Sequence, residues 1–249
     1  MDKRLEKKNI IITGSGGGIG FAAVKRLAES GANIWACMRK PNETAEAAFD
    51  SLAQKNGITI EPVYFDLTDS EAIKRELSGI LAEKKEIHGL VNGAGVPHGG
   101  FFAMTPIRRI REIFDINFFA ALEVTQRVLK QMTRQKFGAI VNIASISGQD
   151  LKAGNCAYGA SKAALIAWTR TLAAEAAAFG IRVNAVAPGL TDTRMAEQME
   201  QRAGADMVAR SAMKRKAKPE EIADVICYLL SDESSFINGE TIRADGGRC

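Results

Sequence analysis

The sequence contains few of the residues that build metal sites. Its 249 residues include two histidines, His88 and His98, and four cysteines, Cys37, Cys156, Cys227 and Cys249. No two cysteines have the spacing of a C-x-x-C or zinc-ligand pair, and two histidines are too few for a multi-histidine centre. We therefore expect no metal. The wide separation of the cysteines is typical of reduced thiols, which indicates a cytoplasmic protein.

The chain also lacks a long apolar segment and a concentrated charge. No run of 18 apolar residues is present, and the charged start MDKRLEKKN leads directly into a short apolar stretch. We therefore expect neither a membrane span nor a signal peptide. The net charge is +4 and the basic residues are scattered, whereas nucleic-acid binding needs a basic stripe. The densest basic runs, KRLEKK and MKRKAK, are interpreted as solvated segments, although the second could border a site for anionic substrates.

Short apolar runs alternate with helical patterns along the whole chain. With 46% hydrophobic residues, the chain is able to bury the core of one α/β domain. We predict helices in FAAVKRLAES, NETAEAAFDSLAQKNG, DSEAIKRELSGILAEK, 107–135, 156–179 and PEEIADVICYLLSD. We predict strands in NIIIT, NIWAC, TIEPVYF, IHGLVN, GAIVNIAS, GIRVNAVAPG and GETIRADGG.

This alternation predicts a Rossmann-type, doubly wound α/β fold. About seven parallel strands would form one sheet with helices on both faces. We find no linker or repeat, so we expect one domain over 1–249, with a substrate lid at about 190–216. The lid holds methionines 195, 199, 207 and 213, whose spacing is more typical of core than of substrate contact. Ligands of such sheets bind beyond the carboxyl ends of the strands.

A glycine-rich turn, TGSGGGIG, lies between the first predicted strand and the first predicted helix. Glycines there permit a tight turn, and the helix N-terminus favours an anion. A tight turn without a ligand is the alternative, but this position in an alternating fold favours dinucleotide binding. We assign the pyrophosphate and the nearby ribose to Gly14, Ser15, Gly18, Ile19 and Gly20.

Tyr158 and Lys162 stand four residues apart, on one face of a predicted helix. Such a pair arises often by chance, so the other motifs of the chain must decide whether it is catalytic. The order T-G-x-x-x-G-I-G, N-x-A-G, Asn, Ser, Y-x-x-x-K and P-G resembles the short-chain dehydrogenase/reductase family, from Ile10 to about Gly247. The resemblance implies a nicotinamide cofactor and a catalytic tetrad of Asn117, Ser145, Tyr158 and Lys162.

The tetrad fits the reduction of a ketone. The proton donor needs a pKa near the working pH, and free tyrosine has a pKa of about 10. An ammonium about 4 Å away contributes on the order of 4 kcal/mol, and lowering the pKa by two units needs about 2.7 kcal/mol. Lys162 is therefore expected to lower the pKa of Tyr158. Ser145 would hold the carbonyl oxygen, and the resemblance gives Asn117 a water that relays protons; a solvent-facing Asn117 is the alternative.

The resemblance implies further cofactor contacts. Asn92, Ala94 and Gly95 of VNGAG would line the adenine ribose, although Gly93 replaces the usual second Asn and removes one hydrogen bond of the sheet. Asp66, with Leu67, would accept from the adenine amino group, or alternatively cap the strand end. The nicotinamide carboxamide is assigned to Pro188, Gly189, Thr191 and Thr193.

The end of the second strand predicts NADP(H). NAD enzymes often carry an acidic residue there, which would repel a 2′-phosphate. Here Met38 takes that position and Arg39 follows. Arginine binds phosphate through two hydrogen bonds, so Arg39 is the expected determinant. A solvated Arg39–Lys40 pair is the alternative.

Within the family, the size and INGETIRADGG resemble 3-oxoacyl-[acyl-carrier-protein] reductases of fatty acid biosynthesis. That resemblance implies an acyl-thioester substrate, with acyl carrier protein as a candidate carrier docked near the active-site entrance. Lys136 fits one docking position, but Phe179 replaces the basic residue of the other. Sugars, steroids and other secondary alcohols stay open as substrates, as do an epimerase and a non-catalytic regulator. The long helices at 107–135 and 156–179 predict self-association, and the resemblance implies a homotetramer.

Overall fold

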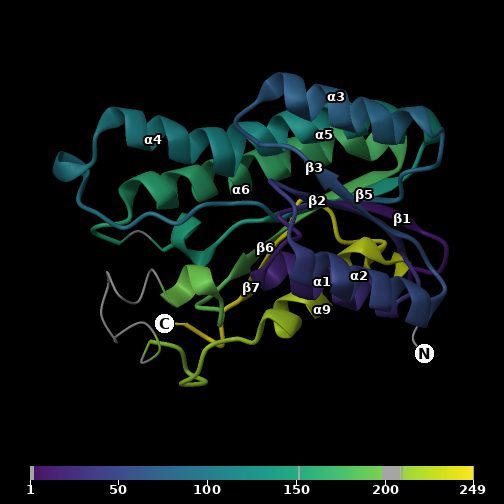
Figure 1. Cartoon of the computed structure of the whole chain (residues 1–249). Helices are drawn as coiled ribbons and strands as arrows, with labels where there is room; N and C mark the ends of the chain where they lie inside the picture. Colours follow the sequence, from purple (N-terminus) through teal and green to yellow (C-terminus); the bar gives the residue numbers. More distant parts are fainter. Residues whose placement is uncertain (1–2, 151, 198–207, 209, 249) are drawn as a thin grey trace.

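Seven parallel strands form one sheet with helices on both faces (Figure 1). The computed structural model describes residues 3–150, 152–197, 208 and 210–248. The strand order is β3-β2-β1-β4-β5-β6-β7, so the direction of winding reverses between β1 and β4. The strands are β1 (Asn9–Thr13), β2 (Asn33–Met38), β3 (Ile60–Tyr64), β4 (Gly89–Asn92), β5 (Gly138–Ile143), β6 (Ile181–Pro188) and β7 (Thr241–Ala244). This architecture confirms the predicted doubly wound fold.

The helices form two layers (Figure 1). One layer holds α1 (Gly18–Glu29), α2 (Glu43–Asn56) and α9 (Pro219–Leu230), and the other holds α3 (Ser70–Ala82), α4 (Ile107–Phe114), α5 (Ala120–Gln135) and α6 (Cys156–Ala176). No helix among the described residues is long and apolar enough to cross a membrane.

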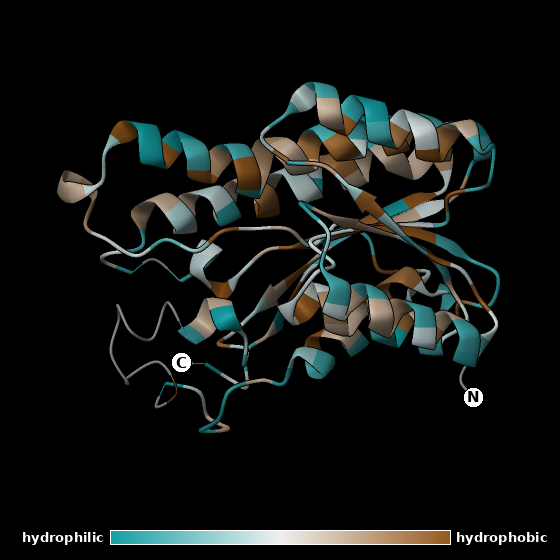
Figure 2. Cartoon of the chain, in the orientation of Figure 1, coloured by the Kyte–Doolittle hydropathy of each residue, from teal (hydrophilic) through white to brown (hydrophobic). Residues whose placement is uncertain are grey.

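Each face of the sheet has its own apolar core. Ile10 and Ile12 of β1 pack toward α1 and α9, whereas Ile11 between them packs toward α3 and α5. Successive side chains of a strand point to opposite faces, so a strand covered on both faces needs an unbroken apolar run. This explains the sequence NIIIT. Figure 2 shows the same division, with hydrophobic residues on the sides of the helices that face the sheet.

Local sequence signals set the ends of several helices. Asn42 caps α2 by accepting a hydrogen bond from the Ala45 backbone N–H at 3.2 Å, and Gly57 ends that helix at φ 66°. Asp69 caps α3 in the same way, through the Ala72 N–H at 3.0 Å. Side-chain capping and a left-handed glycine satisfy backbone groups that the helix itself leaves unpaired.

Two predicted helices differ from the structure. The segment 107–135 is not one continuous α-helix, because a π-helical turn, η2 (Asp115–Phe119), separates α4 from α5. The Tyr/Lys helix α6 ends at Ala176 and continues as a short 3-10 turn, η4 (Ala177–Phe179). Part of the expected lid, including Met199 and Met207, lies outside the described residues.

Candidate active site

A cavity of about 760 Å³ lies at the carboxyl ends of the central strands. Residues just beyond β1, β2, β4, β5 and β6 line it, among them Gly14, Arg39, Ala94, Ser145 and Gly189. The reversal of strand order between β1 and β4 opens this crevice, which is where doubly wound sheets bind ligands. All the predicted cofactor residues line it except Ser15 and Asn92, and of the predicted tetrad Asn117 does not.

The glycine turn is built for close backbone approach. A Cβ on Gly20 would lie 2.0 Å from the Gly14 carbonyl oxygen, and one on Gly14, which has φ +74°, would lie 2.8 Å from the Ala94 backbone. A Cβ on Gly17 would instead meet nothing within 4 Å, where the turn borders the cavity. The first turn of α1 holds no acidic residue. These features fit a dinucleotide pyrophosphate at the N-terminus of α1.

Ser15 and Asn92 have other contacts. The Ser15 hydroxyl is fully buried and donates to the Cys37 carbonyl at 3.0 Å. The Asn92 amide donates to Thr125 Oγ1 and Asn142 Oδ1, both at 2.8 Å. Both side chains therefore join elements of the scaffold below the cavity and are not among the residues that line it.

Gly93 is held by its backbone. Thr13 Oγ1 accepts from the Gly93 and Ala94 N–H groups at 3.2 and 3.4 Å. A Cβ on Gly93 would lie 2.7 Å from the Thr13 carbonyl oxygen. The hydroxyl of Thr13 thus connects β1 to the turn after β4 at the position where the family usually has a second asparagine.

Lys162 is a buried cation at the centre of the site. It is 4% exposed, and its Nζ donates to the Ile143 carbonyl at 2.7 Å. A Cβ on Gly95 would lie 3.4 Å from that Nζ and 3.2 Å from Asn117 Oδ1, so Gly95 leaves room for both groups. Burial lowers the pKa of Lys162 to about 8.

Burial of Lys162 predicts a pH-dependent stability. The pKa of a free lysine is about 10.4, so between pH ~8 and ~10.4 the unfolded chain binds more protons at this residue than the folded chain does. This group therefore makes the free energy of unfolding rise with pH across that window, by on the order of 3 kcal/mol. We expect urea unfolding of the wild type, measured against Lys162→Met, to show this rise. If the difference in unfolding free energy between the wild type and Lys162→Met is the same at pH 7 and pH 10, the prediction is contradicted.

Tyr158 lies beside Ser145 in the cavity. Tyr158 is 6% exposed; burial raises the pKa of its phenol, and a hydrogen bond with Ser145 partly offsets that rise. The Ser145 hydroxyl also accepts from the Ser147 N–H at 3.1 Å. We expected Lys162 to lower the pKa of the phenol. Instead burial raises the pKa of the phenol, and the group that partly lowers it is Ser145.

Asn117 points into the protein rather than toward solvent. It is 1% exposed in the π-helical turn, where Oδ1 accepts from the Val96 N–H at 2.8 Å and Nδ2 donates to the Val96 carbonyl at 3.1 Å. Nδ2 also donates to Ser161 Oγ at 3.2 Å, and Ser161 donates to the Tyr158 carbonyl at 2.8 Å. The π-helical turn places the Asn117 amide between Val96 and Ser161, and such turns are frequent at functional sites. Ser161, which the motif Y-x-x-x-K leaves unspecified, links Asn117 to the Tyr158 backbone.

Arg39 and Asp66 lie at one end of the cavity. Arg39 is exposed on the segment after β2, next to the buried Met38. Asp66 Oδ1 accepts from both the backbone and the hydroxyl of Thr68 at 2.8 Å, so the alternative role as a cap is present. These bonds lower the pKa of Asp66, with a smaller contribution from the charge of Arg39. The ionised Asp66 carboxylate and the exposed Arg39 guanidinium therefore lie at the same end of the cavity.

The segment after β6 closes the other side of the cavity. A Cβ on Gly189 would lie 2.7 Å from Asp245 Cα, so this glycine permits the close approach of the chain beyond β7. The Thr193 methyl group lies beside Gly18, 3.1 Å from where a Cβ would stand. Thr193 Oγ1 donates to the Thr191 carbonyl at 3.3 Å and accepts from the Ala196 N–H at 3.2 Å.

The two expected docking positions lie away from this cavity. Lys136 precedes the amino end of β5 and Phe179 that of β6, whereas the cavity is at the carboxyl ends. Six strand residues span about 20 Å. Lys136 Nζ stands 4.7 Å from the centre of the Phe179 ring, a cation–π contact. Within one chain, Lys136 and Phe179 therefore do not line the cavity, and their role in docking stays a prediction.

Sequence reasoning missed several charged residues of the cavity. Arg109 and Glu112 of α4 line it and form an ion pair at 3.0 Å. Arg194 and Arg248 line it too, from the segment after β6 and from the chain after β7. Arg248 is the arginine of DGGRC, and it was not predicted because it is far in the sequence from the motifs that mark the site.

A glycine turn on a doubly wound sheet, with a buried tyrosine–lysine pair beside a serine, defines a nicotinamide-dependent oxidoreductase. A family model described as enoyl-(acyl carrier protein) reductase matches residues 14–248. The chain belongs to the short-chain dehydrogenase/reductase family.

Two curated relatives match the chain over nearly its full length. The 3-oxoacyl-[acyl-carrier-protein] reductase FabG of Thermotoga maritima is 36% identical over 247 residues, which cover 98% of each chain. The acetoacetyl-CoA reductase of an Acinetobacter species is 34% identical over 245 residues, 97% of this chain and 98% of the relative.

Solved structures share the fold but differ in activity. A candidate NAD(P)-dependent gluconate 5-dehydrogenase from Beutenbergia cavernae, solved with NADP at low occupancy, has a TM-score of 0.91 and 31% identity, covering 99% of this chain and 98% of that one. An NAD+-bound xylitol dehydrogenase has a TM-score of 0.90 and 32% identity, covering 98% and 100%.

Proposed function

We propose that this enzyme reduces a 3-oxoacyl thioester to the 3-hydroxyacyl form with NADPH. The observation that carries the proposal is the buried Tyr158, hydrogen-bonded to Ser145 in the same cavity as the glycine turn. The phenol keeps its proton at neutral pH and can give it to a developing alkoxide, and we assign Lys162 the task of bringing the pKa of the phenol toward the working pH, where a general acid is most effective. The names of the two curated relatives support a 3-oxoacyl substrate.

The residues divide the chemistry between them. The glycine turn and the residues after β6 would hold the nicotinamide cofactor, which when bound would supply a hydride for the carbonyl carbon. Ser145 orients the carbonyl oxygen, and Tyr158 Oη gives that oxygen its proton. The carbonyl thus gains one hydride and one proton, which is the balance of a ketone reduction. We assign Lys162 the ribose and the stabilisation of the phenolate, and Asn117 the proton relay.

Oxidation of a sugar or polyol is the second candidate function. The titles of two solved relatives, a gluconate dehydrogenase candidate and a xylitol dehydrogenase, favour it. Initial rates should be compared for NADPH with acetoacetyl-CoA and for NADP+ with gluconate and xylitol. Faster reduction of the thioester supports our proposal, and turnover of the polyols alone replaces it. Cofactor binding without net turnover of any substrate would favour a regulator or an epimerase.

Arg39 should determine the preference for NADPH. Its guanidinium is exposed at the cavity, and a 2′-phosphate there would gain charge-assisted hydrogen bonds. Such a bond is worth roughly 1.5–3 kcal/mol, so Arg39→Ala should lower the NADPH-to-NADH ratio of kcat/KM by about 10- to 100-fold. Lys40→Ala, the neighbouring exposed cation, is the matched control. An unchanged ratio in Arg39→Ala would contradict the assignment.

We extend the proposal to the assembly and the domain. We propose that the whole chain is one catalytic domain with a substrate lid at about 190–216. We also propose that four copies of the chain form a homotetramer. Exposed apolar side chains between η1 (Phe102–Met104) and η2 support contact between copies: Phe101, Phe102, Met104, Ile107 and Phe119. A scattering mass of a single chain at micromolar concentration contradicts the tetramer.

A further inference from the structure

A second, smaller cavity adjoins the substrate side of the site. Its volume is about 250 Å³, and it shares Ile146, Gly189, Leu190 and Arg248 with the larger cavity. Ile146 follows Ser145 directly, so the side cavity lies next to the residue proposed to hold the reacting carbonyl. A substrate group attached to that carbonyl can therefore extend toward it.

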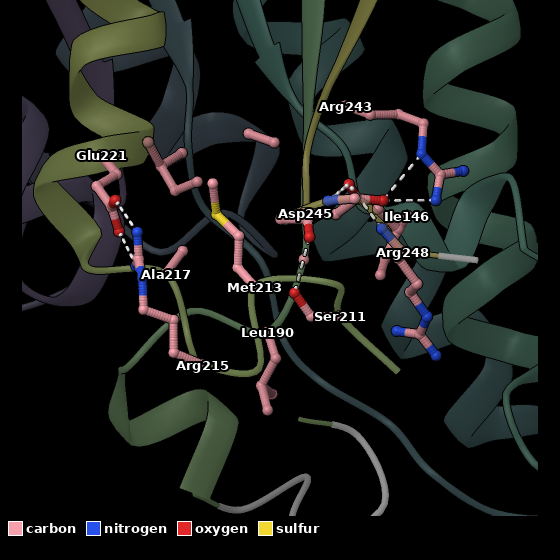
Figure 3. Close-up of a pocket in the computed structure, with 15 residues that line it drawn as sticks. Ile146, Leu190, Ser211, Met213, Arg215, Ala217, Glu221, Arg243, Asp245 and Arg248 are labelled. Atoms are coloured by element: carbon pink, nitrogen blue, oxygen red, sulfur yellow. Dashed lines mark hydrogen bonds and ion pairs between the residues drawn. The ribbon is translucent and has the colours of Figure 1, made fainter. Parts of the chain in front are cut away.

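Three arginines line the side cavity, and two of them are fully paired (Figure 3). Arg215 makes a two-pronged contact with Glu221 at 2.6 and 2.7 Å. Arg243 bonds Asp245 at 2.6 and 3.0 Å and Asp150 at 2.8 and 3.4 Å. The charges of these two arginines are thus satisfied within the protein.

Arg248 differs from the other two. Its side chain is 7% exposed, and its ion pair among the described residues is a long one, from Nε to Asp150 Oδ2 at 3.5 Å. The Asp150 carboxylate also accepts hydrogen bonds from Arg243. In Figure 3 the Arg248 side chain extends away from the Arg243–Asp245 pair. A buried guanidinium with weak pairing gains from an oxyanion on its terminal nitrogens.

The backbone holds Arg248 at the junction. Residues 211–213 pair with 246–248: the Ala212 N–H donates to the Gly247 carbonyl at 3.2 Å, and the Met213 N–H to the Gly246 carbonyl at 3.1 Å. Asp245 Oδ1 accepts from the Gly247 and Arg248 N–H groups at 3.1 and 3.4 Å. The position of Arg248 is therefore set by a network independent of its own charge.

The surrounding charge also favours an anion. The segments 143–147 and 188–196 contribute Arg194 to the lining of the larger cavity but no carboxylate. The acidic residues that line this cavity, within the described part of the chain, are Asp66 at the Arg39 end and Glu112, which is paired with Arg109. The two acidic residues that line the side cavity, Glu221 and Asp245, are paired with Arg215 and Arg243. The part of the larger cavity beside Ser145 is lined by Arg194 and Arg248.

We infer that Arg248 determines specificity by binding an oxyanion of the substrate at the side cavity. This inference rests on the proposed ketone reduction at Tyr158 and narrows its substrates to anionic ones. A carboxylate of a small oxo acid and a phosphate of a pantetheine thioester share the chemistry that a guanidinium recognises. The two sources place the charge at different distances from the ketone.

The test compares three probes and three variants. Acetoacetate carries a carboxylate, acetoacetyl-CoA carries phosphates, and the N-acetylcysteamine thioester of acetoacetate is neutral. The variants are Arg248→Met, which removes the charge at similar volume, Arg248→Lys, and Arg26→Met as a control. Arg26 is paired with Asp224 and lines neither cavity. Thermal unfolding verifies that each variant is folded.

We expect Arg248→Met to lower kcat/KM for an anionic probe by about 10- to 100-fold, the loss typical of a hydrogen bond to a charged group. The kcat/KM for the neutral thioester should change by less than about threefold, Arg248→Lys should recover part of the loss, and Arg26→Met should resemble the wild type. Loss with acetoacetate identifies a carboxylate, and loss with acetoacetyl-CoA alone identifies a phosphate. Equal effects on all probes, or the same loss in Arg26→Met, overturn the inference.

A binding measurement separates this inference from the proposed function. If no probe is reduced, the proposed reaction fails, and calorimetry of 3-hydroxybutyrate and CoA with the NADPH-loaded protein still tests Arg248. Weaker binding of either anion to Arg248→Met than to Arg26→Met supports the inference. Equal or undetectable binding in both overturns it.

Discussion

Tyr158→Phe should lower kcat for a 3-oxoacyl thioester by about 10²- to 10⁴-fold, the contribution typical of a general acid. The substitution removes Oη and keeps the buried ring, so packing against the cavity wall is preserved. Because the lost group acts on the developing alkoxide, KM should change far less than kcat. Stopped-flow absorbance of NADPH with acetoacetyl-CoA measures both.

The matched control is Tyr64→Phe. Tyr64 ends β3, and its hydroxyl interacts with Glu46 on α2. This variant also loses one phenolic hydroxyl, but outside the cavity, and its kcat should stay within about twofold of the wild type. Equal activity of Tyr158→Phe and the wild type, with NADPH still consumed, would remove Tyr158 from the mechanism.

Gly20→Ala should have the second largest effect. Its Cβ would stand 2.0 Å from the Gly14 carbonyl oxygen, a contact between two backbone segments that no side-chain rotation relieves. Overpacking of this kind costs about 1–3 kcal/mol, and more where the backbone resists displacement. We expect the free energy of unfolding to fall by about 3 kcal/mol and NADPH affinity to fall at least tenfold, because the turn itself is displaced. Urea unfolding and fluorescence titration measure the two effects.

Gly79→Ala provides the comparison for Gly20→Ala. Gly79 is exposed in α3, and a Cβ there meets nothing within 4 Å. Alanine is favoured over glycine in a helix by roughly 0.5–1 kcal/mol, so this variant should be slightly more stable than the wild type. Equal effects of the two substitutions would show that the close contact at Gly20 is relieved at little cost.

The fold follows from signals that are local in the sequence. Buried strands such as NIIIT are apolar throughout because both faces of the sheet are covered, and Asn42, Gly57 and Asp69 mark helix ends through bonds within a few residues. The order of strands and helices then leaves few topologies, because crossovers between parallel strands are right-handed. The confirmed fold class rests on these features.

The π-helical turn lacked such a signal. The partners of Asn117 are Val96 and Ser161, which are 21 and 44 residues away in the chain. The helical pattern of 107–135 is unaffected by one extra residue in a turn. The tertiary contacts of Asn117 therefore determine the local backbone conformation, and no residue near it in the sequence predicts the π-helical turn.

The motifs predicted which residues lie near the cavity better than they predicted where the side chains of those residues point. Ser15 and Asn92 lie in the right turns, yet their side chains bond Cys37, Thr125 and Asn142. Side-chain direction depends on partners from other strands, which a linear pattern does not contain. Arg248 enters the cavity because residues 211–213 pair with the chain after β7, again a contact between distant segments.

The central claim is that NADPH reduces a 3-oxoacyl thioester at Tyr158. Its most direct test is the stoichiometry of NADPH oxidation with acetoacetyl-CoA, with the product identified by mass spectrometry. Our account predicts one 3-hydroxybutyryl-CoA for each NADPH oxidised. Tight NADPH binding with no oxidation in the presence of acetoacetyl-CoA would contradict it.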